Sequence, residues 1–431
     1  MRKITLSLIL ILAGLYACKK ETDPVFDKSP DERINDTLHH YQQLLVQAPY
    51  GWKALIYPAG VPGSVFSFYL QFNASNRVQM FSDIDAASTG TVKESSWRLK
   101  ALQQPSLLFD TYSYIHVLCD PDAGENGGEY GQGLGSDFEF AINGMHGDTL
   151  VLTGRFHRSK AVLIKATQQD KDDYYQHRIN RGIDSISRFL TYFKKLVTAT
   201  ASYDVEVNKN LHQIKLRWTA NGKVRSVVTG YHYTASGVAL SPAFKDTARN
   251  VIISSIENIR WAGSSITCEI NKAAAAITES VRPEVLDISA PERWYRTAQD
   301  NKSYWQAADG FHVNGVDDAF HIRSIPSLAG MVYWPGDESS ADVLGFAITP
   351  AQGGQPDIEF GVLYYPPTFT DDGRVVFNEY RVFGTPPVAA PVNDTRALMK
   401  GKSGFYIVRT SEKTYDMVSA SDGKSWITWV F

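Results

Sequence analysis

The chain has 431 residues, 43% of them hydrophobic and 21% charged, which is ordinary for a globular protein. The formal net charge is −3 at pH 7, and a mildly acidic chain without a clustered basic face excludes nucleic acid as the expected partner. The length suits two domains, or three, and beyond the first residues no segment is long and apolar enough to span a bilayer.

The first eighteen residues have the pattern of an export signal. The apolar run over residues 4–15 is shorter than the roughly 20 residues of a membrane-spanning helix and has the length of a signal-peptide core. It ends in Leu-Tyr-Ala-Cys, which resembles the lipobox cut by lipoprotein signal peptidase. We therefore predict a lipoprotein signal peptide over 1–17, with an ordinary signal peptide or a membrane anchor as the alternative.

Cleavage at this point would leave Cys18 as the first residue of the mature chain. Its thiol would carry diacylglycerol, and residues 18–28 would form a polar, lipidated tether. Lys19 and Lys20 follow, with no Asp to act as an inner-membrane retention signal. The expected location is the outer membrane, with the protein lipid-anchored and exposed at the cell surface.

Residues 29–168 are predicted to form a helix followed by an antiparallel β domain. Ser29, Pro30 and Glu32 form a helix start with a capping box. From Trp52 the hydrophobic period changes to two, as in "VFSFYLQF" and "TLVLTGRF". The short turns between such strands require antiparallel pairing, so we expect a meander that forms a barrel or a sandwich.

A long linking helix is predicted over 169–200, because apolar residues recur there at helical spacing from Tyr175 to Val197. The remaining residues, 201–431, are predicted to form a second, mainly β domain. Its clearest turn is Asn221-Gly222, between two strand-like runs. The expected fold class is therefore mainly β with a few helices.

Two distant segments align without a gap, "FYLQFNASNRVQMFS" from Phe68 and "FYIVRTSEKTYDMVS" from Phe405. They share the leading Phe-Tyr, a Met (Met80 and Met417) and the final Ser. Either the β halves are related by duplication, or two amphipathic hairpins coincide by chance.

Several segments carry a resemblance to a known family: "FDKSPDERI", "YGWKALIYP", "FYLQFNASNRVQMFSD", "GSDFEF" and "KAVLIKAT", together with the lipobox. They resemble an uncharacterised family of Bacteroidota-type surface lipoproteins, a domain of unknown function, most densely over residues 26–167. The resemblance implies genes beside SusC/SusD-like outer-membrane uptake systems, whose proteins are the implied partners. It implies no catalytic residues.

The sequence does not match the common catalytic and nucleotide-binding motifs that it superficially resembles. The "GKS" at Gly401 lacks the earlier glycine of a phosphate loop, because Arg396 stands there. The "GQGLGSD" at Gly131 precedes a strand where a dinucleotide fingerprint needs a helix. Neither H-E-x-x-H nor G-x-S-x-G occurs in the sequence.

A glycine-rich acidic segment, "CDPDAGENGGEYGQGLGSD", offers the hard oxygen ligands that Ca²⁺ prefers. The candidate ligands are Asp120, Asp122, Asn126 and Glu129. The spacing is not that of an EF-hand, and a solvated loop is the alternative reading.

Aromatic residues make up 12% of the chain and cluster beside Pro and Gly in the C-terminal half. Tyr333, Trp334, Tyr364 and Tyr365 are the candidates for contact with a glycan or peptide ligand, and core packing is the alternative role. The two cysteines after Cys18, Cys119 and Cys268, are expected to be buried free thiols, with a disulfide as the alternative.

These features predict a non-catalytic binding or accessory component of a glycan or peptide uptake system at the cell surface. A surface hydrolase acting on glycan or peptide is the first alternative, and a structural envelope component is the second. No cofactor is expected other than the Ca²⁺ considered above.

Overall fold

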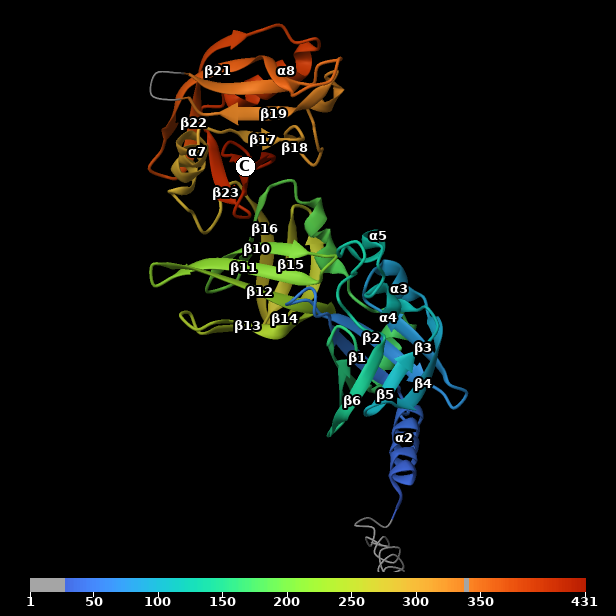
Figure 1. Ribbon diagram of the computed structural model, residues 1–431. Helices are drawn as coiled ribbons and strands as arrows, with labels where there is room; N and C mark the ends of the chain where they lie inside the picture. Colours follow the sequence, from blue (N-terminus) through green and yellow to red (C-terminus); the bar gives the residue numbers. More distant parts are fainter. Residues whose placement is uncertain (1–27, 337–340) are drawn as a thin grey trace, which may run out of the picture.

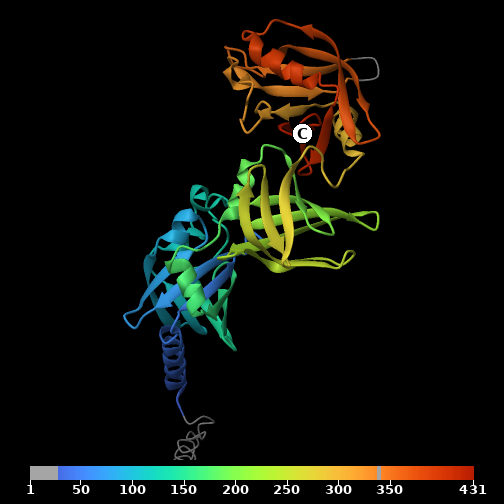
Figure 2. The same ribbon diagram turned by 180° about the vertical axis from the view of Figure 1, so that it is seen from behind.

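The computed structural model describes residues 28–336 and 341–431, so the signal peptide, Cys18 and nearly all of the tether lie outside the described residues. Three β units follow one another along the chain and stand in a row (Figures 1 and 2). The expected mainly β fold with a few helices is confirmed. Among the described helices, none has the length and apolar character needed to cross a membrane.

Helix α2, Pro30–Val46, begins with the predicted capping box: Ser29 Oγ accepts from the Glu32 N–H while the Glu32 carboxylate accepts from the Ser29 N–H. The helix projects from one end of the row (Figure 1). Its C-terminal end is held by Trp52, whose indole N–H donates to the Leu45 carbonyl at 3.0 Å. The buried Leu45 joins the core of the first unit.

The first unit is a closed antiparallel barrel, in which the first strand pairs with both the second and the eighth. Alternate side chains fill its interior, among them the fully buried Phe68, Leu70 and Met80. Short helices α3 (Ala86–Gly90), α4 (Tyr114–Val117) and α5 (Ala123–Asn126) lie in its connections. The strands are β1 (Trp52–Tyr57), β2 (Phe66–Phe72), β3 (Arg77–Ser82), β4 (Lys93–Ala101), β5 (Pro105–Phe109), β6 (Glu139–His146), β7 (Thr149–Gly154) and β8 (Lys160–Lys165).

The long linking helix predicted over 169–200 is wrong. The segment forms helix α6 (Gln168–Tyr175), a 3-10 helix η1 (Gly182–Arg188) and strand β9 (Phe193–Val197). His177 has a φ of +55°, which ends the first helix. The residues at helical spacing face different cores: the Tyr175 ring meets Tyr69 and Phe81 of the first barrel, whereas Ile183 packs in the second.

The second unit is another closed antiparallel barrel, and β9 closes it by pairing with both the tenth and the sixteenth strand. Its core includes Tyr203, Trp218 and Phe244, whose rings meet edge to face. The remaining strands are β10 (Ser202–Asn208), β11 (Gln213–Ala220), β12 (Lys223–Tyr233), β13 (Gly237–Asp246), β14 (Val251–Ala262), β15 (Ser265–Ile270) and β16 (Ala273–Ser280). The predicted single domain over 201–431 therefore holds seven of the eight strands of this barrel, β10 to β16, together with a third unit.

The third unit is a nine-stranded antiparallel sheet that curls so that β17 also pairs with β25. Helix α7 (Ala290–Asp300) adds Trp294 to its core, where it stacks on Trp305 and Tyr333. Helix α8 (Ala389–Met399) and a 3-10 helix η2 (Ile322–Ser324) complete the unit. The strands are β17 (Trp305–Ala307), β18 (His312–Val313), β19 (Leu328–Trp334), β20 (Asp342–Ile348), β21 (Asp357–Phe369), β22 (Arg374–Phe383), β23 (Phe405–Arg409), β24 (Thr414–Ser419) and β25 (Ser425–Val430).

The two aligned sequence segments form hairpins of identical register. Phe68 pairs with Ser82 in the first unit, and Phe405 pairs with Ser419 in the third. In each hairpin the shared Met is fully buried. The alignment therefore reflects the same hairpin geometry in the first barrel and in the sheet of the third unit.

The joint between the first two barrels is polar and buried. Asp83, with no exposed surface, accepts from the Ser67 N–H and hydroxyl of its own barrel and from the Tyr233 N–H of the second. Arg181 donates to the Asp83 carbonyl at 3.0 Å and to the Asp184 carboxylate at 2.9 Å. These bonds tie both barrels to the segment that connects them.

The joint between the second barrel and the third unit is mainly aromatic. Tyr192, just before β9, and Phe193, its first residue, pack against Tyr406 and Trp426. The Tyr192 hydroxyl donates to Asp416 at 2.7 Å. The third unit is thereby attached through a small cluster at one end of its sheet.

Candidate ligand-binding surface

The four predicted aromatic contacts divide between the core and the surface. Tyr333 and Tyr364 are fully buried in the core of the third unit, so their prediction as ligand contacts is wrong. Trp334 and Tyr365 are 43% and 53% exposed. Strand alternation explains the division, because adjacent residues on β19 and β21 point to opposite faces of the sheet.

A buried carboxylate fixes the turn that follows Trp334. Asp342 accepts from the hydroxyls of Tyr333 at 2.6 Å and Tyr295 at 3.0 Å, and from the Gly336 N–H at 2.7 Å. Burial raises the pKa of Asp342, while these hydrogen bonds act against the rise. The buried Tyr333 thus has a supporting role, since it holds the strand end that carries Trp334.

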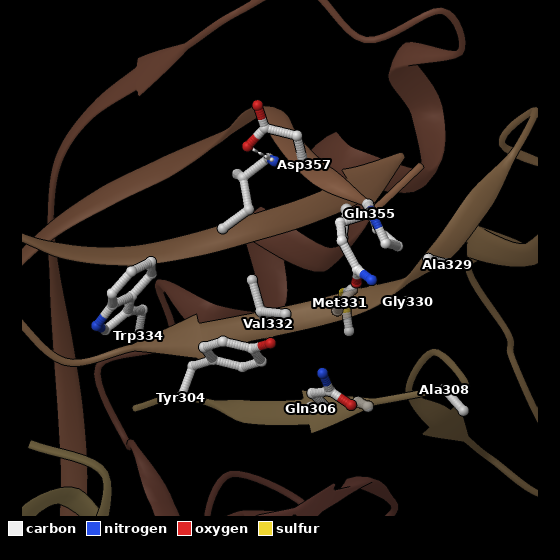
Figure 3. A pocket seen from close by; sticks show the side chains of 14 residues that line it. Tyr304, Gln306, Ala308, Ala329, Gly330, Met331, Val332, Trp334, Gln355 and Asp357 are labelled. Atoms are coloured by element: carbon white, nitrogen blue, oxygen red, sulfur yellow. Dashed lines mark hydrogen bonds between the residues drawn. The ribbon is translucent and has the colours of Figure 1, made fainter. Parts of the chain in front are cut away.

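Trp334 and Tyr304 form one end of a hollow of about 460 Å³ on the outside of β17, β19 and β21 (Figure 3). Their ring centroids are 5.8 Å apart at an interplanar angle of 52°. The hollow also contains polar side chains from two segments: Gln306 on β17, and Gln355 and Asp357 at and just before the start of β21. Flat apolar rings beside amide and carboxylate groups can contact both the C–H face and the hydroxyl groups of a sugar.

A second hollow, of about 470 Å³, also has Trp334 in its lining. Gln299 and Lys302 line it together with Pro335 and Val343. Trp334 is the residue common to both hollows.

Tyr365 lines neither of these two hollows, and its ring packs instead against Tyr380 on β22. The two ring centroids are 5.1 Å apart, and Tyr380 is 51% exposed. They form a second exposed aromatic pair on the third unit.

The acidic loop over residues 120–129 uses its polar side chains to hold its own backbone. Asp120 accepts from the Tyr112 hydroxyl and the Asp122 N–H, and Asp122 accepts from the Gly124 N–H. The Asn126 amide donates to the carbonyls of Val117 and Asp120, both at 2.9 Å.

Glu129, the fourth candidate Ca²⁺ ligand, lies in a β-bridge with Gly133. Over residues 28–336 and 341–431, no group of three or more His, Cys, Asp or Glu side chains is arranged to hold a metal ion. The structure thus does not bring the predicted Ca²⁺ ligands together.

Cys119 and Cys268 are both free thiols, as expected; Cys268 is buried and Cys119 is half-buried. Burial raises the pKa of each to about 12. Neither therefore has the lowered pKa of a reactive thiolate.

Sequence reasoning missed most of the surface around Trp334. Tyr304, Gln306 and Lys302 come from the segment after α7, and Gln355 and Asp357 from the start of β21. Strand pairing brings them beside Trp334, because β17 pairs with β19 and β21 lies one strand beyond β20. Tyr304 could have been suspected as a contact residue, because it is an aromatic residue directly before a strand.

The fold and this surface define a class of protein: a mainly β chain of two closed barrels and a third curled sheet that exposes aromatic side chains. The chain belongs to the family described as "Domain of unknown function (DUF4302)", whose model matches residues 22–257. That match covers more than half of the chain, including the first barrel and most of the second.

No curated protein matches the sequence. Among solved structures, a putative DNA polymerase III beta subunit from Eubacterium rectale is 7% identical, with 88% of this chain and 90% of that chain covered and a TM-score of 0.13. A catalytically inactive virginiamycin B lyase from Staphylococcus aureus with quinupristin is 9% identical, with 88% and 95% covered and a TM-score of 0.09. Neither similarity carries an argument about fold or function.

Proposed function

We propose that this protein is a lipid-anchored component of the outer membrane, exposed at the cell surface, which binds glycan or peptide without cutting it. It would serve as an accessory to a SusC/SusD-like uptake system of a Bacteroidota-type cell. The lipobox at Cys18 and the two lysines after it support the proposed location at the outer membrane. The family resemblance supports the genomic neighbourhood.

The observation that carries the binding proposal is Trp334, a 43% exposed indole that forms a wall of two hollows. Large aromatic side chains that stay exposed beside a concave surface are typical of binding sites. A tether would hold this site near its partners, so a weak site could act at high effective concentration.

The test is to incubate the lipid-free chain with a panel of glycans and peptides and to measure both binding and product release. We expect binding without turnover, weakened about tenfold or more by Trp334→Ala. Phe156→Ala is the matched control, because Phe156 is an 84% exposed aromatic residue on the first barrel. That control should bind as the unaltered chain does.

Two results would overturn the proposal. Product release that is lost when a single carboxylate is replaced, for example in Asp357→Asn, would identify a hydrolase. Binding that Trp334→Ala leaves unchanged would move the site elsewhere. Anchoring is tested separately, because Cys18→Ala should abolish palmitate labelling and cleavage by lipoprotein signal peptidase.

A further inference from the structure

Trp334 begins a row of four side chains that crosses four strands on the outer surface of the third unit. The strand register pairs Trp334 with Val343, Val343 with Leu363, and Leu363 with Arg381. Side chains directly opposite one another on paired strands share a face. Since neighbouring strands lie about 4.8 Å apart, this outer row is roughly 14 Å long.

Arg381, at the far end of the outer row, is a cation without an acidic partner among the described residues. The nearest acid along its strand, Glu379, pairs instead with Arg396 and Lys400 on α8 and just beyond it. The Arg381 guanidinium lies 5.6 Å from the centroid of the Tyr380 ring. Its N–H groups are therefore available for bidentate bonds to a carboxylate or sulfate.

A second cation lies at the Trp334 end of the outer row. Lys302 is exposed and lines the hollow that Trp334 and Val343 also line. No described acid forms an ion pair with it. The acid Asp357 lines the first hollow and not this one. The outer row thus runs between two positive charges that have no ion-pair partner within residues 28–336 and 341–431.

The surroundings of the Trp334 end and the centre of the row favour a glycan over a peptide. A peptide that adds to a sheet needs a free strand edge, whereas β20 and β21 are each paired along both sides. Such an edge occurs at the Arg381 end, where β22 pairs with β23 through Arg374 and Val375. The exposed rings of Trp334, Tyr365 and Tyr380 offer flat faces at both ends of the row. Sugar rings can stack on such faces without any main-chain hydrogen bond.

We propose that the outer row binds an acidic oligosaccharide, with a sugar ring on Trp334 and its carboxylate or sulfate groups on Arg381 and Lys302. This inference rests on the proposed binding function and adds the charge class of the ligand. Because both cations are exposed, the affinity should fall as salt is added.

The experiment is isothermal titration of the lipid-free chain with three probes: polygalacturonate oligosaccharides, chondroitin sulfate oligosaccharides and neutral galactan oligosaccharides. The first carries carboxylates only and the second also carries sulfates. We expect at least one acidic probe to bind about tenfold more tightly than the neutral probe. Arg381→Gln should remove that advantage, and Arg381→Lys should keep part of it because it retains the charge.

Arg225→Gln is the matched control, because Arg225 is an exposed arginine on β12 of the second barrel and its loss changes the net charge equally. It should leave all three affinities unchanged. Equal affinities for acidic and neutral probes, or no binding of any acidic probe, would overturn the inference. If Trp334→Ala still weakens binding of a neutral probe, the proposed binding function survives that failure. If Trp334→Ala weakens nothing, the binding function fails as well.

Discussion

At the scale of single residues, the structure places titratable groups where water cannot reach them. His212 is fully buried between the rings of Phe66 and Tyr231, and its Nδ1 lies 3.2 Å from the Val65 carbonyl. His232 is 6% exposed, and its Nδ1 has no hydrogen-bond partner in the described structure. Burial is the main reason that the pKa of both rings is lowered, for His232 to about 4.

These histidines predict that the protein becomes less stable in mild acid. A histidine whose pKa is lowered by folding takes up its proton more readily in the unfolded chain, so stability is lost as the pH falls from about 6.5 toward 4. For His232 the shift corresponds to about 3 kcal/mol. Urea unfolding at pH 7, 6, 5 and 4 should show a fall that is smaller in His232→Gln.

His40→Gln is the control for that series, because His40 lies exposed on α2. Its stability profile should follow that of the unaltered chain. A profile for His232→Gln that also follows the unaltered chain would contradict the assignment of the acid sensitivity to this ring.

At the scale of elements, a single buried carboxylate organises the turn between β7 and β8. Asp137, 4% exposed, accepts from the N–H groups of Phe156, His157 and Ser159 and from the Ser159 hydroxyl. A Cβ added at Gly154 would overlap sterically with Asp137 Oδ2, so only glycine fits here. The turn and the carboxylate therefore depend on each other.

We expect Asp137→Ala to lower the free energy of unfolding by about 3 kcal/mol, because it leaves several buried N–H groups without partners. Gly154→Ala should be destabilising alone but should cost less in the Asp137→Ala background, where the colliding carboxylate is gone. Asp148→Ala is the control, since its carboxylate is 74% exposed in a surface ion pair. Strictly additive effects in the double variant would contradict this coupling.

How far the sequence predicts each element depends on whether the element is specified locally. The α2 capping box and the hairpin strands were predicted because their signals lie within a few residues of one another. The segment after α6 was misread because residues at helical spacing serve two different cores, a tertiary effect that periodicity does not contain.

The candidate site likewise depends on tertiary contacts that the local sequence does not indicate. Of the four candidate contact residues, Trp334 and Tyr365 are exposed while Tyr333 and Tyr364 are buried, because adjacent residues on a strand point to opposite faces of the sheet. A pair of adjacent aromatics alone does not say which member faces outward. Gln355 and Asp357 join Trp334 through the pairing of β19, β20 and β21, and nothing near them in the sequence indicates that pairing.

At the scale of the whole molecule, the two joints differ in kind and predict different cooperativity. The joint of the first two barrels buries Asp83 and His212, whose Nδ1 and carboxylate oxygen are 3.8 Å apart. The third unit is attached through the aromatic cluster around Tyr192 and Phe193. We therefore expect the first two barrels to unfold together.

Asp83→Ala should expose this difference, since it removes an acceptor for the Ser67 and Tyr233 N–H groups at once. Hydrogen exchange should then speed up in the strands of both barrels and stay unchanged in β19–β25. Faster exchange confined to the first barrel would show that the two barrels are independent units.

The central claim is that the protein binds its ligand on the outer surface of the third unit, around Trp334. Hydrogen exchange measured by mass spectrometry on the lipid-free chain, with and without a pool of neutral and acidic oligosaccharides and peptides, tests it most directly. The account predicts slower exchange confined to β19, β20, β21, β22 and the segment around Tyr304, with no product released from the pool. Slower exchange confined to the first two barrels, or cleavage of a pooled compound, would contradict it.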